Sequence, residues 1–181
     1  MRSILTGLVL LLSPALAAGQ SLVVQGSAGP TMIDSGYSVA GGLGYSPTSH
    51  VTFLAQLDQS HLSSRFSTDG RSGQSAFRGG TVTLATAEVQ VSLFGLDRIT
   101  PYGLAGIGIG ASHPNVNEFF QDRITNTARG VFVGGGVRVP LQGRLSLFAD
   151  GRVFLGAEAG ETLGLAPVRA GLAWRFCIAN H

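Results

Sequence analysis

The chain has 181 residues, enough for one domain, and 44% of them are hydrophobic while only 12% are charged. Its 12 basic residues are all arginine and are dispersed, so a formal net charge of +2 indicates no nucleic-acid surface. A single cysteine, Cys177, excludes an intramolecular disulfide framework. After the first residues no stretch of about twenty apolar residues occurs, so no transmembrane helix is predicted.

The amino terminus has the pattern of a secretory signal peptide. Arg2 provides a positive start, residues 4–12 are apolar, and residues 15–17 form a small-x-small cleavage site. The apolar part is too short for a permanent anchor. We therefore expect cleavage directly after this site or within the next two residues, which makes 1–19 a removed signal peptide and 20–181 the mature domain.

The mature chain alternates between apolar and polar residues with period two, which is strand geometry. About eight strands are predicted, over residues 21–29, 37–45, 51–58, 81–94, 101–111, 130–139, 144–155 and 163–176. Short turns at 46–50, 96–100 and 140–143 alternate with longer polar connections, above all 59–80 and 112–129.

The faces of these strands differ in chemistry. Val131, Val133 and Val137 share one face of their strand, whereas Arg138 lies on the other, and this pattern is repeated in the strands that follow. In an exported chain, strands with one apolar and one charged face are typical of a transmembrane β-barrel. Such a sheet must close into a barrel, because open sheet edges cannot lie in hydrocarbon. The 27 glycines fit a crowded lumen. Val82 and Leu84 break the parity, which predicts a bulge or a strand extension above the bilayer.

An even number of strands places both termini on one side, so the short turns are predicted to be periplasmic and the long connections external. Aromatic residues fall at the ends assigned to the periplasmic interface, where an aromatic girdle is expected: Tyr45, Phe94, Tyr102, Trp174 and Phe176. The alternative is that these rings cap the core of a soluble barrel.

Four segments, residues 101–110, 134–138, 145–152 and 168–176, resemble the small eight-stranded outer-membrane β-barrel proteins. That group includes the barrel of outer-membrane protein A and the adhesin-like barrels of enterobacteria. The resemblance implies an all-β, eight-stranded, up-and-down barrel in the bacterial outer membrane, without cofactor or enzymatic activity. It also implies a monomer that contacts lipid, lipopolysaccharide, the assembly machinery and an extracellular ligand. Members commonly end on an aromatic residue, whereas five residues follow Phe176 here.

Charged side chains are predicted on the inward faces: Asp58, Glu88, Arg138, Asp150, Arg152 and Arg169. One hypothesis is a pairing network that fills a lumen too narrow for bulk water, since buried charges are normally paired. The other hypothesis is an ion path or gate. Both are compatible with the strand pattern.

The remaining chemistry-bearing residues give weaker signals. His61 and Ser63 share a face, as in lipid A deacylase barrels, but they open a predicted loop. Other histidines are too scattered for metal-ligand spacing, so no metal site is predicted. The glycine-rich segment 103–110 lies in a strand with no helix after it and is no nucleotide cradle. Arginines in the 59–80 connection suggest contacts with lipopolysaccharide phosphates: Arg65, Arg71 and Arg78.

We therefore predict a non-enzymatic outer-membrane barrel with a structural or surface-interaction role. Three alternatives stay open at this point. They are a small passive pore, a lipid-modifying enzyme, and a soluble periplasmic calyx, which would need apolar residues inside and charges outside.

Overall fold

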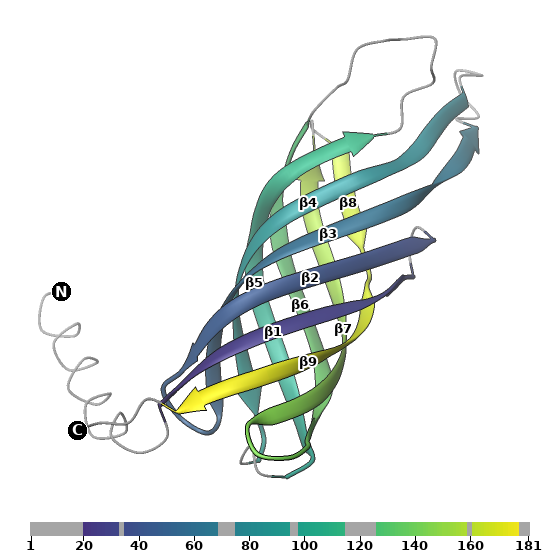
Figure 1. The fold of residues 1–181 in the computed structure, drawn as a ribbon. Helices are drawn as coiled ribbons and strands as arrows, with labels where there is room; N and C mark the ends of the chain where they lie inside the picture. Colours follow the sequence, from purple (N-terminus) through teal and green to yellow (C-terminus); the bar gives the residue numbers. More distant parts are fainter. Residues whose placement is uncertain are drawn as a thin grey trace, which may run out of the picture.

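The computed structural model describes residues 20–32, 35–68, 75–94, 98–114, 126–158 and 161–177. They form a closed antiparallel β-barrel, as predicted (Figure 1). No helix in these ranges is long and apolar enough to cross a membrane. The predicted signal peptide lies outside the described residues and stays a prediction.

Nine strand segments build the wall: β1 (Ser21–Thr31), β2 (Gly36–Ser46), β3 (Val51–Thr68), β4 (Ser75–Ser92), β5 (Thr100–Pro114), β6 (Asn126–Pro140), β7 (Leu145–Glu158), β8 (Glu161–Leu165) and β9 (Val168–Cys177). Each strand from β1 to β7 pairs with the next along the chain, and β9 pairs with β1. Because β8 and β9 both pair with β7, one after the other, they share the eighth position of the wall.

The eighth strand was predicted as continuous, and the structure divides it at Ala166 and Pro167. Proline has no amide N–H, so it cannot donate to a strand ladder. The carbonyl groups at the break are nevertheless satisfied, because Met32 N donates to Ala166 O at 2.8 Å and Arg152 N donates to Pro167 O at 3.1 Å. The barrel therefore stays joined across the interruption.

The strands also run further than predicted. Most of the 59–80 connection is a strand hairpin, in which β3 and β4 stay paired out to Thr68 and Ser75. These mostly polar residues lie beyond the apolar band. They therefore lack the alternating apolar residues from which the strands were predicted. Of the two alternatives predicted from Val82 and Leu84, the strand is extended, because β4 begins at Ser75, and the bulge is absent there, because pairing from Gly80 to Ser92 is regular. A register shift occurs between Leu62 and Arg65 of β3.

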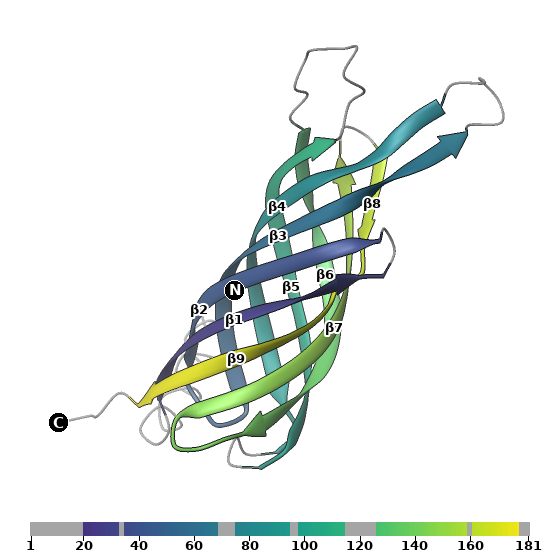
Figure 2. The ribbon, with the colours of Figure 1, turned by 45° about the vertical axis from the view of Figure 1, so that its right-hand side comes forward.

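The two ends of the barrel differ. At the short-turn end, the connections include 47–50 and 141–144, the second containing Gly143 with a φ of 65°. At the opposite, long-hairpin end, β2 pairs with β3 only up to Gly36 and Leu62, and β3 and β4 continue past that level. Figure 2 shows this hairpin projecting beyond the end of β1 and β2.

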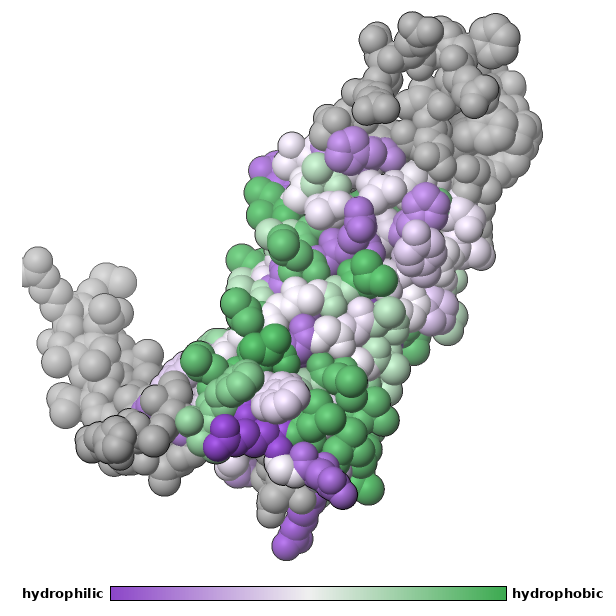
Figure 3. Space-filling view, in the orientation of Figure 1, coloured by the Kyte–Doolittle hydropathy of each residue, from purple (hydrophilic) through white to green (hydrophobic). Residues whose placement is uncertain are grey.

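The outer wall is apolar where the predicted faces point outward. Leu43, Ile107 and Val133 are 66%, 63% and 61% exposed, so they are not buried in a protein core. Exposed side chains of this kind occur on every long strand. Figure 3 shows them covering much of the wall, with polar side chains more frequent toward the long-hairpin end. A continuous apolar wall of this extent requires a non-aqueous neighbour.

Inward glycines make room for large side chains in the lumen. Phe132 and Phe148 are buried inside the barrel. A Cβ added at Gly106 would lie 2.6 Å from Phe132 Cζ, and one at Gly171 would lie 2.7 Å from Phe148 Cζ. These are closer than carbon atoms approach, so glycine at both positions is a packing requirement of the narrow lumen.

Candidate functional site

The six charged residues predicted to face inward all lie inside the barrel. They come from β3, β4, β6, β7 and β9, and each is at most 9% exposed: Asp58, Glu88, Arg138, Asp150, Arg152 and Arg169. Strand alternation places them there, because their neighbours in sequence point into the outer wall. The lumen therefore holds three carboxylates and three guanidinium groups at close quarters.

Arg152 is the centre of the larger cluster. Its Nη1 lies 2.8 Å from Glu88 Oε2 and its Nη2 lies 2.9 Å from Asp150 Oδ2. The Nε group donates to the second oxygen of Asp150 at 3.3 Å. The guanidinium also lies 5.5 Å from the centre of the Phe132 ring. Arg152 thus pairs with two buried carboxylates from different parts of the wall, β4 and β7.

The second cluster surrounds Asp58. Arg169 forms an ion pair with this carboxylate, and Ser38 Oγ donates to it at 3.0 Å. A further contact of 3.9 Å, from Arg169 Nε to Asp150 Oδ1, joins the two clusters. Ser60 lies on the same side, 3.4 Å from Asp58 Oδ1. Charge from four strands, β3, β4, β7 and β9, is therefore connected across the lumen.

Arg138 is different, since it forms no ion pair with a carboxylate of the described residues. Its Nη2 donates to Gln90 Oε1 at 2.9 Å, and Gln90 Nε2 donates to Glu88 at 2.8 Å. Its guanidinium lies 5.3 Å from the centre of the Tyr102 ring. Gln90 therefore relays Arg138 to the network without direct charge pairing.

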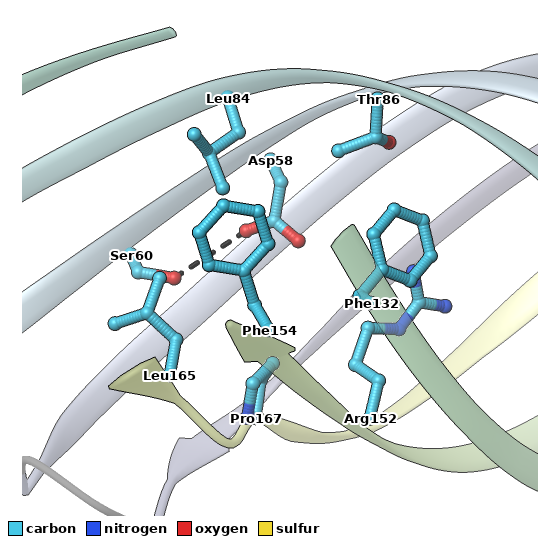
Figure 4. A pocket seen from close by; sticks show the side chains of 9 residues that line it. All are labelled: Asp58, Ser60, Leu84, Thr86, Phe132, Arg152, Phe154, Leu165 and Pro167. Atoms are coloured by element: carbon cyan, nitrogen blue, oxygen red, sulfur yellow. Dashed lines mark hydrogen bonds between the residues drawn. The ribbon is translucent and has the colours of Figure 1, made fainter. Parts of the chain in front are cut away.

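The free space in the lumen is small. A cavity of about 20 Å³ lies between the ionic network and an apolar layer closer to the long-hairpin end, and Phe132, Arg152 and Phe154 contribute to its wall (Figure 4). That volume admits about one water molecule. Chemically, the arrangement can fix the strands against one another.

The apolar layer itself was missed by sequence reasoning. Val82 and Leu84, taken as a sign of irregularity, face the lumen with 3% and 5% exposure and join a buried apolar cluster. Phe154 and Leu165 belong to the same cluster. The available signal was their even numbering, since the even-numbered residues of a regular β4 face the lumen. The assumption that an inward face must be polar concealed it.

One residue of the predicted aromatic girdle was assigned to the wrong face. Tyr102 is 4% exposed, and its hydroxyl donates to Asp150 Oδ2 at 3.1 Å inside the barrel. Ile107 and Ile109 are exposed on the same strand, so even-numbered residues such as Tyr102 must point inward. The other four positions face outward, with Tyr45 partly and Phe94, Trp174 and Phe176 more fully exposed. Trp174 and Phe176 stack at 6.0 Å.

His61 lies in β3, not in a loop, and points outward. Its ring lies 5.3 Å from that of Tyr37, and its Nδ1 is 3.3 Å from Thr81 Oγ1. Ser63 is exposed on the same face. No acidic partner of His61 occurs in the described ranges, nor does any group of three metal-binding side chains. The geometry thus gives no nucleophile-base-acid arrangement here.

Two further predictions concern single residues. Cys177 is exposed and free at the short-turn end of β9. Arg65 and Arg78 are directly opposite in the backbone register of β3 and β4, whereas Arg71 lies outside the described residues. Their contacts with lipopolysaccharide stay a prediction.

Comparison with solved structures identifies the fold. No family model and no curated protein matches the chain. The chain is similar to Neisserial surface protein A, with 14% identity, a TM-score of 0.66, and coverage of 87% of this chain and 99% of that one. It is also similar to the N-terminal β-barrel domain of Pseudomonas aeruginosa OprF, with 15% identity, a TM-score of 0.65, and coverage of 86% of this chain and 97% of that one. A third similar structure is the Yersinia pestis attachment invasion locus protein Ail in complex with the heparin analogue sucrose octasulfate. Its identity is 15%, its TM-score is 0.51, and the match covers 87% of this chain and 99% of that one. The fold is that of the small eight-stranded outer-membrane β-barrels.

Proposed function

We propose that this chain is a non-enzymatic barrel protein of a bacterial outer membrane. In this proposal it acts as a monomer, with the short-turn end in the periplasm and the long-hairpin end outside the cell. One observation carries the proposal: apolar side chains up to 68% exposed cover the outer wall, while carboxylates and guanidinium groups are sealed within. This polarity is the reverse of a soluble calyx, and it matches the needs of a barrel in lipid.

The ionic network is assigned a structural role. Three carboxylates and three guanidinium groups balance in charge. Each guanidinium nitrogen of Arg152 is hydrogen-bonded, whereas Arg169 Nε and Nη2 and Arg138 Nε have no hydrogen-bond partner. Buried charges are tolerated when they are paired and hydrogen-bonded in this way. The cavity beside them is about 20 Å³, which admits about one water molecule. These features favour a closed plug over the passive pore.

The surface role rests on the β3–β4 hairpin. It projects past the level at which β1 and β2 end, as Figures 1 and 2 both show. In the proposed orientation the hairpin extends from the outer leaflet into the medium, where it meets lipopolysaccharide or an extracellular partner. Arg65 and Arg78 on this hairpin suit an anionic partner, because guanidinium groups bind phosphate and sulfate with paired hydrogen bonds.

The assignment to the membrane is tested by refolding. Purified protein diluted from urea into detergent micelles should regain β-sheet circular dichroism and remain monomeric in size-exclusion chromatography with light scattering. Dilution into detergent-free buffer should give aggregates, because the apolar wall has no other cover. A monodisperse product in buffer alone would refute a membrane barrel and favour the soluble calyx.

Two assays separate the remaining alternatives. The refolded protein should show no conductance in planar bilayers at any applied voltage, whereas discrete conductance steps would establish a pore. Expression of the protein or its His61→Ala variant should leave lipid A mass spectra identical to those of cells with an empty vector. A change that depends on His61 would establish the lipid-modifying enzyme.

A further inference from the structure

The short-turn mouth of the lumen is lined by hydroxyl groups and guanidinium groups. Every position of the wall contributes one inward side chain near this mouth. Six of them carry hydroxyls and are at most 5% exposed: Ser21, Ser46, Thr52, Ser92, Thr100 and Ser146. The remaining two positions supply Arg138 from β6 and Arg175 from β9.

Both arginines have buried N–H groups without partners. Arg138 is 1% exposed, and its Nε has no hydrogen-bond partner in the structure. Arg175 is half-buried, and neither its Nε nor its Nη2 has one. Buried donors left unsatisfied are costly, and guanidinium donors more so. Two such groups at one mouth point to a ligand that accepts hydrogen bonds.

Among the described residues, the charged side chains at this mouth are arginines. Arg138 lies near enough to act electrostatically on Arg175, and neither forms an ion pair with a carboxylate of the described residues. Arg98 and Arg144 are exposed at the rim, where their carbonyl groups accept hydrogen bonds from Thr100 Oγ1 and Arg175 N. Of the described acids, Glu88 and Asp150 act electrostatically on Arg138 and are paired with Arg152 further inside, whereas Asp97 lies outside the described residues. The mouth therefore attracts anions.

We propose that the unpartnered N–H groups of Arg138 and Arg175 form a binding site for a small soluble oxyanion of the phosphate or sulfate class. Guanidinium N–H groups are the donors that such anions accept from. Four of the surrounding hydroxyls are already engaged, because Ser46 Oγ lies 2.7 Å from Thr52 Oγ1, Thr100 Oγ1 donates to Arg98 O, and Ser146 Oγ donates to Ala173 O. Half-exposure of Arg175 provides access from the short-turn end. The ionic network lies across the lumen beyond Arg138, so we expect the anion to bind at this end and not to pass through. The site thus serves binding, not transport.

Calorimetric titration of the refolded protein in a non-ionic detergent tests the site. Sodium sulfate or sodium phosphate is added at constant ionic strength, with chloride as the balancing anion. We expect saturable binding of one anion per barrel. Arg175→Gln keeps the size and polarity of the side chain but removes its charge, and it should weaken binding about tenfold or more, the value of one charge-assisted hydrogen bond. Arg175→Lys keeps the charge but loses the forked guanidinium donors, so its affinity for the anion should lie between those of Arg175→Gln and the unsubstituted protein.

The matched control is Arg129→Gln, because Arg129 is exposed on the outer wall of β6 and far from this mouth along the strand. It should bind the anion like the unsubstituted protein. Unsaturable heats, or equal affinity in Arg175→Gln and the unsubstituted protein, would overturn the proposal. A third arm adds phosphatidylglycerol to the micelles without free phosphate. If the protein binds that lipid but shows no saturable binding of free sulfate or phosphate, the ligand is a lipid headgroup. That result would also overturn a soluble-anion site.

Discussion

Removing the charge of Arg152 should destabilise the barrel far more than removing a surface charge. Arg152→Met keeps most of the aliphatic stem but deletes the contacts of 2.8, 2.9 and 3.3 Å to Glu88 and Asp150. The six network charges then change from three against three to three against two. Breaking a buried pair by removing one partner costs about 3–5 kcal/mol, because the other charge stays buried without compensation.

The remaining contacts place the expected cost at the lower end of that range. Glu88 keeps its hydrogen bond from Gln90 at 2.8 Å, and Asp150 keeps that from Tyr102 at 3.1 Å. We expect a loss of about 3 kcal/mol in the free energy of unfolding, measured by urea unfolding in lipid vesicles. Arg129→Met, at an exposed position, should stay within about 0.5 kcal/mol of the unsubstituted protein.

A double variant tests the reasoning itself. Adding Glu88→Gln to Arg152→Met restores the charge balance, so it should recover about 1–2 kcal/mol, which appears as a coupling energy between the two positions. Strictly additive losses, or a loss below about 1 kcal/mol for Arg152→Met alone, would mean that the pair behaves like an exposed surface ion pair. Either result would refute a sealed, low-dielectric network.

Two further substitutions probe the packing and the wall. Gly171→Ala should cost about 1–3 kcal/mol in the same unfolding assay, since its Cβ would meet the Phe148 ring at 2.7 Å, whereas Gly103→Ala, with nothing within 4 Å, should be near neutral; equal effects would contradict the crowded lumen. Ile107→Arg, in the apolar band, should cost about 2–4 kcal/mol in vesicles, against about 0–1 for Thr127→Arg near the long-hairpin end. Equal costs would argue that lipid does not surround Ile107.

The sequence predicts the facing of the strands well and their extent poorly. Charges such as Asp150, between apolar neighbours, leave one choice of inward face, so the alternation identifies it. The hairpin beyond residue 62 carries no such signal, because its sequence does not alternate between apolar and polar residues, although its backbone ladder continues. Pro167 divides the last strand through a missing amide, although the pattern of apolar residues runs on to Val168 and beyond.

The candidate site was predictable in its members but not in its pairing. Parity alone places Arg152 and Glu88 in the lumen, but their contact spans 64 positions of sequence and depends on the stagger of the closed barrel. Parity also places Tyr102 and Arg175 inside. Their roles were missed because an aromatic residue near a strand end suggested a girdle, and a lone inward arginine suggested nothing beyond the strand.

The central claim is that the apolar face of each strand meets lipid and the charged face does not. Photolabelling with a diazirine lipid in vesicles, followed by peptide mass spectrometry, measures this directly. We predict insertion at Val133, Leu147 and Leu172 and none at Arg138 or Asp150. Labelling of the two charged positions, with the three apolar ones untouched, would contradict the account.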